Sequence, residues 1–145
     1  MIKLKQILTE QDISGLFPLA RTIWREVFPP IIGSAQTEYM LKTYQSEENI
    51  RHEIEEGAQY FFIENEDSRP VGYLAYELHD DCLFISKLYL VQSERGKGLT
   101  SEIFNLFENK ARENDKAFLR LRVNRGNSQA INVYLHKGFT LFCSK

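Results

Sequence analysis

The sequence has no long apolar run, no excess of charge of either sign and no paired cysteines. No apolar stretch approaches the roughly 20 residues that span a bilayer, and the N-terminus lacks the apolar core of a secretory signal. We therefore expect no membrane partner and a cytoplasmic location. The formal net charge of −2 gives no support for nucleic-acid binding, because such domains normally carry a basic excess.

Cysteine is scarce as well. Cys82 and Cys143 form no CxxC pair and have no histidine at metal-ligand spacing, so both are interpreted as small buried residues, with no disulfide and no metal site. Apolar residues make up 43% and charged residues 26% of the 145 positions, which excludes a disordered chain. This length suits one core, and we expect residues 1–145 to form a single domain.

The first element is a strand followed by a long helix. Alternation predicts the strand over residues 2–7, and Thr9 is a suitable N-cap for a helix whose apolar residues recur at three- and four-residue steps as far as Phe28. Pro29-Pro30 would end this helix. Pro18 lies inside it and would kink or divide it.

Two shorter helices are expected next, with Ser34 and Ser46 as N-caps and Gly57 as the stop of the second. The period then changes from helical to extended. Three strands are predicted, at residues 58–64, 71–78 and 82–91. The last of them (CLFISKLYLV) is nearly all apolar, as expected for a central strand that is covered on both faces.

The C-terminal part alternates between helices and strands. An amphipathic helix begins near Leu99, and a strand at 118–123, a short helix at 128–137 and a closing strand at 139–143 follow it. This order implies an α/β (α+β) fold with a mixed sheet and helices on its faces.

The turn SERGKGLT, residues 93–100, joins the central strand to the amphipathic helix. A helix N-terminus presents unpaired N–H groups and a partial positive charge, and both favour phosphate. Gly96 and Gly98 let the main chain approach an anion, while Arg95 and Lys97 add positive charge. We therefore predict a phosphate site here. A nucleotide-binding P-loop is disfavoured, because its Gly-x-x-x-x-Gly-Lys-Ser/Thr spacing is not evident.

Two segments together resemble the GNAT superfamily of acetyl-CoA-dependent N-acetyltransferases: LYLVQSERGKGLTSEIF and, about thirty residues later, NSQAINVYLHKGF. The resemblance covers nearly the whole chain. It implies a mostly antiparallel sheet with a splayed central strand pair and helices on both faces. It also implies an enzyme that transfers an acetyl group from acetyl-CoA to a primary amine of a small molecule or peptide. The alternative is a catalytically inactive acyl-CoA-sensing domain of the same fold.

The resemblance also assigns residues to the cofactor. The pyrophosphate loop would be Arg95-Gly96-Lys97-Gly98-Leu99-Thr100, in which Thr100 carries a side chain where the family usually has none. The backbone of Leu88 and Leu90 would pair with the pantetheine arm as an added strand, and Asn127 would hold the cofactor farther along.

Tyr134 lies at the family's general-acid position, where its phenol would protonate the departing sulfur. An alkyl ammonium has a pKa of roughly 10, so a base or a water relay must take its proton first. The side-chain candidates for this base are Asp81, His79 and Glu77, and a water chain is equally allowed.

The acceptor and the oligomeric state are the least specified features. Acidic residues on the N-terminal helices would attract a cationic amine such as a polyamine or a peptide N-terminus, or simply form the solvated side of those helices. They are Glu38, Glu47, Glu48, Glu53, Glu55 and Glu56. The family usually has two strands after the last helix, whereas the residues after Phe139 suffice for one. The bare edge left by a missing strand suggests a homodimer.

Overall fold

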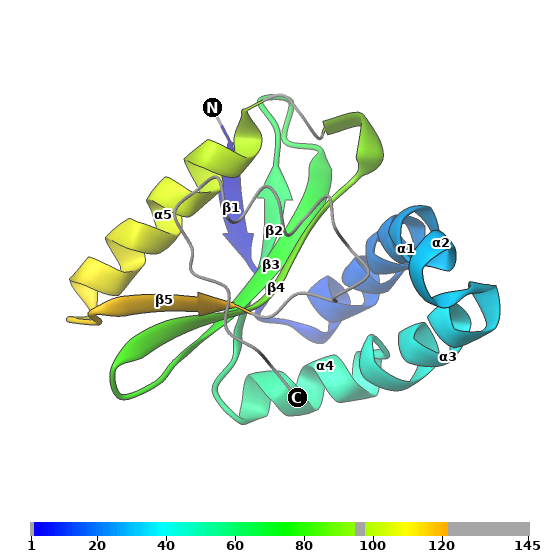
Figure 1. Cartoon of the computed structure of the whole chain (residues 1–145), viewed down its shortest axis with the longest axis horizontal. Helices are drawn as coiled ribbons and strands as arrows, with labels where there is room; N and C mark the ends of the chain where they lie inside the picture. The colour runs from blue at the N-terminus through cyan, green and yellow to red at the C-terminus, as the bar shows by residue number, and fades with distance from the viewer. Residues whose placement is uncertain (1, 95–97, 122–145) are drawn as a thin grey trace.

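The computed structural model of the chain describes residues 2–94 and 98–121 (Figure 1). These residues form one five-stranded sheet with the order β1-β2-β3-β4-β5, in which only β4 and β5 are parallel. The strands are β1 (Lys3–Gln6), β2 (Gln59–Glu64), β3 (Pro70–Leu78), β4 (Cys82–Leu90) and β5 (Phe118–Leu121). The helices are α1 (Glu10–Val27), α2 (Pro29–Ile32), α3 (Ser34–Tyr44), α4 (Glu47–Glu55) and α5 (Leu99–Glu113), with a 3-10 turn at Gln92–Glu94.

This arrangement confirms the predicted fold class, a mixed and mostly antiparallel sheet with helices on both faces (Figure 1). The strands predicted at 58–64, 71–78 and 82–91 correspond to β2, β3 and β4. The predicted helix at 128–137, the strand at 139–143 and the missing last strand lie outside the described residues.

Helix α1 begins after Thr9, the predicted N-cap, and its first turn forms a capping box. The Thr9 side chain accepts a hydrogen bond from the Asp12 N–H at 3.1 Å, and the Asp12 carboxylate accepts one from the Thr9 N–H at 3.2 Å. Pro18 does not divide the helix, which continues through it to Val27. Proline removes the N–H that would bond to Ser14, but Ser14 and Pro18 are both exposed, so water can satisfy the free carbonyl.

The connection between α1 and α3 differs from the prediction. Pro29 and Pro30 do end α1, but they also begin the one-turn helix α2, because proline suits the first positions of a helix. Ser34 as an N-cap is wrong: Gly33, with φ of 86°, occupies that position and its carbonyl accepts the Thr37 hydroxyl at 2.7 Å. Ser46 is confirmed as the cap of α4, since its hydroxyl accepts from the Asn49 N–H at 3.2 Å.

The two faces of the sheet are covered by different helices (Figure 1). On one face Ile103, Phe104 and Phe107 of α5 pack against Leu83 and Ile85 of β4, and we call this the α5 core. The other face packs mainly against α1 and α4. Its buried residues include Leu16 and Ile23 of α1, Ile50 of α4, and Tyr60, Tyr73 and Ala75 of the sheet. Each cluster removes apolar surface from water, the main driving force for folding.

Candidate functional site

The ladder between β3 and β4 contains a bulge at Ser86. Ala75 is paired with Lys87 and Tyr76 with Ile85, so Ser86 has no counterpart on β3. The Ser86 hydroxyl is buried and has no hydrogen-bond partner within residues 2–94 and 98–121. A bulge redirects the side chains that follow it and is common beside active sites. Here Ile85 belongs to the α5 core, whereas the Lys87 side chain reaches α4 on the opposite face.

Among the described residues, β4 is paired with β5 over residues 82–85 of β4. The parallel pairs run from Cys82 with Phe118 to Ile85 with Leu121, the last described residue of β5. Residues 86–90 of β4 continue past that point, and this segment contains Leu88 and Leu90, which the family resemblance assigns to the pantetheine arm.

Helix α5 starts close to where β4 ends. Gly98 precedes it in the left-handed region, with φ of 80° and ψ of 0°, a conformation that favours glycine. No described side chain caps this N-terminus, so the N–H groups of the first turn, which starts at Leu99 and Thr100, favour an anion. The predicted loop residues Arg95, Gly96 and Lys97 lie outside the described part of the chain.

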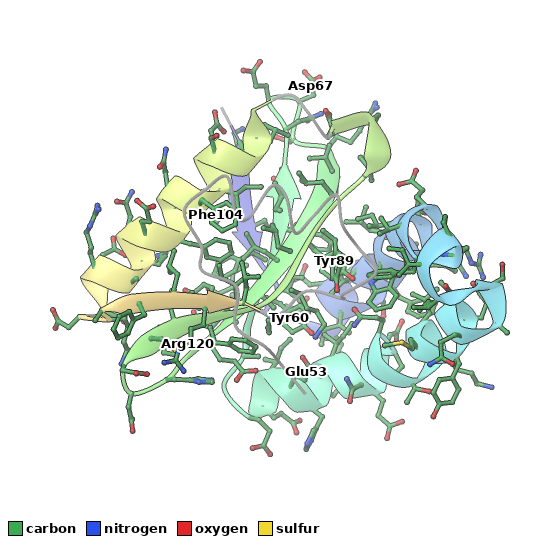
Figure 2. All side chains as sticks on the ribbon, in the orientation of Figure 1. Glu53, Tyr60, Asp67, Tyr89, Phe104 and Arg120 are labelled. Carbon is green, nitrogen blue, oxygen red and sulfur yellow. The ribbon has the colours of Figure 1, made fainter. Side chains whose placement is uncertain are left out.

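A charged cluster lies on the α4 face of the sheet, formed by Glu53, Tyr60 and Lys87. The Lys87 ammonium donates to Glu53 Oε1 at 2.9 Å, and the Tyr60 hydroxyl donates to the same oxygen at 2.8 Å. Asn49 Nδ2 donates to the other oxygen, Oε2, at 2.7 Å. Burial, reinforced by the Glu53 charge, raises the pKa of Tyr60 far above its ordinary value, so its hydroxyl stays protonated and donates to Glu53. Figure 2 shows Glu53 on α4 beside Tyr60.

An aromatic group lies next to this charged cluster. The Tyr73 hydroxyl accepts from Trp24 Nε1 and donates to Gln45 Oε1, both at 3.0 Å. Tyr89 packs against Tyr73 and Trp24, with ring centroids 5.3 Å and 5.6 Å away. Phe28 completes the group, 4.3 Å from the Trp24 ring. Burial raises the pKa of Tyr73 well above its ordinary value, so its hydroxyl stays protonated.

Comparison with protein families agrees with this geometry. The family model described as "Acetyltransferase (GNAT) family" matches residues 19–139. The chain belongs to the GNAT family. The resemblance of its two motifs is thereby confirmed, and the protein is a GNAT-type N-acetyltransferase.

Individual relatives of this GNAT protein are distant in sequence. An uncharacterized N-acetyltransferase in the pepI 3′ region of Lactobacillus delbrueckii subsp. lactis is 26% identical over 149 residues, which cover 97% of this chain and 86% of that protein. The PaiA N-acetyltransferase of Thermoplasma acidophilum, solved in complex with coenzyme A, has a TM-score of 0.87 at 20% identity, over 100% of this chain and 93% of that one. The acetyltransferase YycN of Bacillus subtilis, described as putative, gives 0.74 at 18%, over 100% and 98%. At these identities the two structures show the fold alone.

The predicted site residues of this GNAT protein fall into two groups. Leu88 and Leu90 lie at the end of β4, and Gly98, Leu99 and Thr100 lie where α5 begins. Leu90 belongs to the α5 core, and Leu88 and Leu99 pack against it. Asn127 and Tyr134 lie outside the described residues.

The candidate bases lie toward the other end of β4. Asp81 lies in the turn before β4, about 30 Å along the strand from Leu90 at the usual rise per residue. Its carboxylate is 3.6 Å from the Arg120 guanidinium. His79 and Glu77 lie at the same distant end, and their side chains are 3.0 Å apart.

Sequence reasoning missed the pairing of Lys87 with Glu53 in this GNAT protein. The available signal was a single lysine inside an otherwise apolar strand, a residue that is rarely buried unless it is paired. Its partner lies on a helix far away in the sequence, so the spacing of residues could not identify it.

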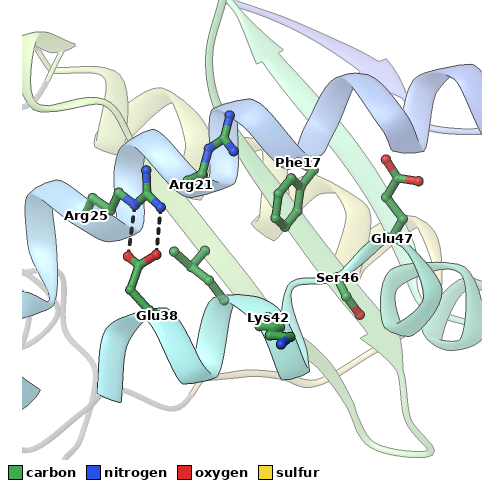
Figure 3. Close-up of a pocket in the computed structure, with 8 residues that line it drawn as sticks. Phe17, Arg21, Arg25, Glu38, Lys42, Ser46 and Glu47 are labelled. Carbon is green, nitrogen blue, oxygen red and sulfur yellow. Dashed lines mark hydrogen bonds and ion pairs between the residues drawn. The ribbon is translucent and has the colours of Figure 1, made fainter. Parts of the chain in front are cut away.

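A shallow pocket of about 280 Å³ lies between α1 and α3, on the outer side of the helices (Figure 3). Arg25 binds Glu38 through two hydrogen bonds of 2.9 Å and 2.6 Å at its rim, and the Arg21 guanidinium lies 5.5 Å from the Phe17 ring centre. No sheet residue lines this pocket, so it is separate from the β4 region.

Membrane-spanning helices and metal-binding clusters are both absent from the described residues of this GNAT protein. No helix there is both long enough and apolar enough to cross a membrane. The same residues contain no group of three His, Cys, Asp or Glu side chains placed to hold a metal ion.

Proposed function

We propose that this GNAT enzyme transfers an acetyl group from acetyl-CoA directly to a primary amine of a small molecule or peptide. We also propose that residues 1–145 form a single domain. The observation that carries the proposal is the junction of β4 and α5. There, the end of β4 that contains Leu88 and Leu90 is followed by a helix N-terminus that no described side chain caps. A diphosphate suits such a helix N-terminus, and the family resemblance assigns the end of β4 to the pantetheine arm.

Acetyl-CoA supplies an activated thioester when bound. The backbone of Leu88 and Leu90 would hold its pantetheine arm, and the loop Arg95-Gly96-Lys97-Gly98-Leu99-Thr100 its diphosphate. Asn127 would bind farther along. The coenzyme A in the crystal structure of the PaiA relative supports this assignment, because that protein shares the fold over the whole of this chain.

Tyr134 is proposed as the general acid, with its phenol giving a proton to the departing sulfur. Asp81 is proposed as the side-chain candidate for the base that removes the amine proton, with a water relay as the alternative. Both oxygens of Glu53 already accept hydrogen bonds, so that carboxylate is no better placed as a base.

The test is thiol release from acetyl-CoA in the presence of amino acids, diamines, aminoglycosides and short peptides. Calorimetric titration with CoA and with ATP accompanies it. We expect CoA to bind more tightly than ATP and at least one amine to stimulate thiol release. CoA binding without turnover on any amine would favour the alternative of a sensing domain, and tighter binding of ATP would refute the acetyl-CoA site.

A homodimer and a cytoplasmic location belong to the same proposal. Dimerisation would cover an open edge of the sheet. Sedimentation across micromolar concentrations tests it, and a monomer at every concentration would contradict it.

A further inference from the structure

Among the described residues, the ion pair between Glu53 and Lys87 lies on the face of the sheet opposite the α5 core. On the α5 side the Tyr76 hydroxyl bonds to the amide oxygen of Gln59. The opposite face carries the charged cluster of Glu53, Tyr60 and Lys87 and the hydroxyl of Tyr73. A polar amine substrate that approaches β4 is therefore stabilised on the face of α1 and α4, where Lys87 directly precedes Leu88.

Lys87 is held in an extended position across the sheet. Tyr60, Ala75 and Lys87 are paired side by side on three neighbouring strands. Because the Ala75 side chain is small, the ammonium of Lys87 reaches across it, to 5.3 Å from the centre of the Tyr60 ring and 2.9 Å from Glu53. The Lys87 side chain is 10% exposed, so its position is fixed but not fully enclosed.

The ammonium of Lys87 retains donor capacity. It carries three N–H donors, and within the described residues only the one to Glu53 has a partner. Glu53, in contrast, accepts three hydrogen bonds from Lys87, Tyr60 and Asn49. The cluster is therefore a neutral ion pair that can still donate hydrogen bonds and has little capacity left to accept them.

Two of the other acidic residues of the helices are paired with basic side chains of their own. Glu38 is bound to Arg25 at 2.6 Å, and Glu56 lies 3.9 Å from His52. A diamine would bring uncompensated positive charge to the neutral cluster, at a cost in desolvation. A zwitterionic substrate brings its own counter-charge.

We propose that Lys87 determines acceptor specificity by binding a carboxylate of the amine substrate, so that the acceptor is an amino acid or a peptide with a free carboxylate rather than a polyamine. This inference rests on the proposed acetyl transfer. Substrate carboxylate, Lys87 and Glu53 then alternate in charge, and Glu53 acts as a positioning residue that keeps the ammonium in place.

The experiment uses pairs of amines that differ in a carboxylate: L-lysine with 1,5-diaminopentane, L-phenylalanine with phenethylamine, and Gly-Gly with its C-terminal amide. Thiol release gives kcat/KM for each amine, and calorimetry on the CoA-loaded protein gives its binding. We expect the carboxylate member of at least one pair to be preferred about tenfold or more. Lys87→Met should remove that preference through the acceptor KM and leave the KM of acetyl-CoA unchanged.

Two further variants separate specificity from folding. The double variant Glu53→Gln/Lys87→Met removes both charges together, so no buried charge is left unpaired, and it should fold and lack the preference. Lys110→Met on α5 removes a lysine from an exposed ion pair of 3.6 Å and should retain the preference.

The outcomes distinguish this inference from the proposed function. The role of Lys87 would be overturned, while acetyl transfer stands, by any of three results. These are a preference for the amine without a carboxylate, equal binding of both amines of every pair, or an equal loss of kcat/KM for both amines in Lys87→Met. Absence of CoA binding and of turnover would instead overturn the proposed function, and the inference with it.

Discussion

Gly72 and Tyr89 approach each other so closely that a β-carbon on Gly72 would lie 2.3 Å from the Tyr89 carbonyl oxygen. Real β-carbons essentially never come within 3.0 Å of a heavy atom outside their own residue and its two chain neighbours, and here the nearby atom belongs to the backbone. Gly72→Ala should therefore displace the end of β4, which contains Leu88 and Leu90. We expect weaker CoA binding, by about tenfold, and a free energy of unfolding lower by about 1–3 kcal/mol, as for an overpacked core. Calorimetric titration with CoA and urea denaturation measure the two effects.

Gly15→Ala is the matched control for Gly72→Ala. Gly15 lies in α1, and its nearest contact would be the Phe62 ring at an ordinary 3.9 Å. Alanine is the better helix former, so this change should leave CoA binding unaltered and raise stability by up to about 1 kcal/mol. If both variants bind CoA as the wild type does, the close contact of Gly72 has no bearing on the site.

The capping carboxylate of Asp12 gives a pH-dependent prediction. Hydrogen bonds from the N–H groups of Leu8 and Thr9, at 3.1 Å and 3.2 Å, lower the pKa of Asp12 in the folded protein. A lowered pKa means that the native state favours the ionised form. The stabilisation is therefore full above the unfolded pKa of about 4 and is lost as the pH falls through the lower folded value.

Asn keeps an acceptor oxygen but loses the charge, so Asp12→Asn should lower the free energy of unfolding by less than about 1 kcal/mol at neutral pH, the scale of a negative charge at a helix N-terminus, and by less still in acid. Urea denaturation at about pH 7 and about pH 3 measures the difference. The control is Asp67→Asn, in the exposed turn between β2 and β3 (Figure 2), which should change little at either pH. A constant effect of Asp12→Asn across this range would show that its charge does not contribute.

Tyr134→Phe tests the assignment of the general acid. Loss of the phenol should reduce kcat by roughly a hundredfold, within the usual range for acid catalysis, and should leave the affinity for CoA unchanged. Tyr39→Phe is the control, since Tyr39 is 57% exposed on α3 and should retain full turnover. A Tyr134→Phe enzyme with wild-type kcat would remove Tyr134 from the mechanism.

Local signals in the sequence predicted local structure well. The capping pairs of Thr9 with Asp12 and of Ser46 with Asn49 lie within three residues of one another, so the sequence itself contains both partners. The prediction of Ser34 as the N-cap was wrong because the N-cap of α3 lies one residue earlier, at Gly33, whose positive φ is one that serine rarely adopts.

Non-local features of the site could not be predicted in this way. The bulge at Ser86 depends on the register between β3 and β4, and a sequence pattern alone does not specify which residue of β4 has no paired residue on β3. The same holds for Lys87 and Glu53, whose contact requires α4 to lie across the sheet. The family motif can therefore be recognised in the sequence, whereas the contacts that form the charged cluster of Glu53, Tyr60 and Lys87 cannot.

The hydroxyl of Tyr73 joins two groups that would otherwise be buried without partners, Trp24 Nε1 and Gln45 Oε1, each 3.0 Å away. Tyr73→Phe leaves both unsatisfied at a cost of about 1–3 kcal/mol each, so we expect the free energy of unfolding to fall by about 2–4 kcal/mol in urea denaturation. Tyr76→Phe is the control on the opposite face of β3, where the hydroxyl makes a longer, part-buried bond of 3.3 Å to Gln59. That variant should lose less than about 1 kcal/mol. If the free energy of unfolding fell equally in the two variants, the loss would come from removing a tyrosine hydroxyl and not from leaving Trp24 and Gln45 without a partner.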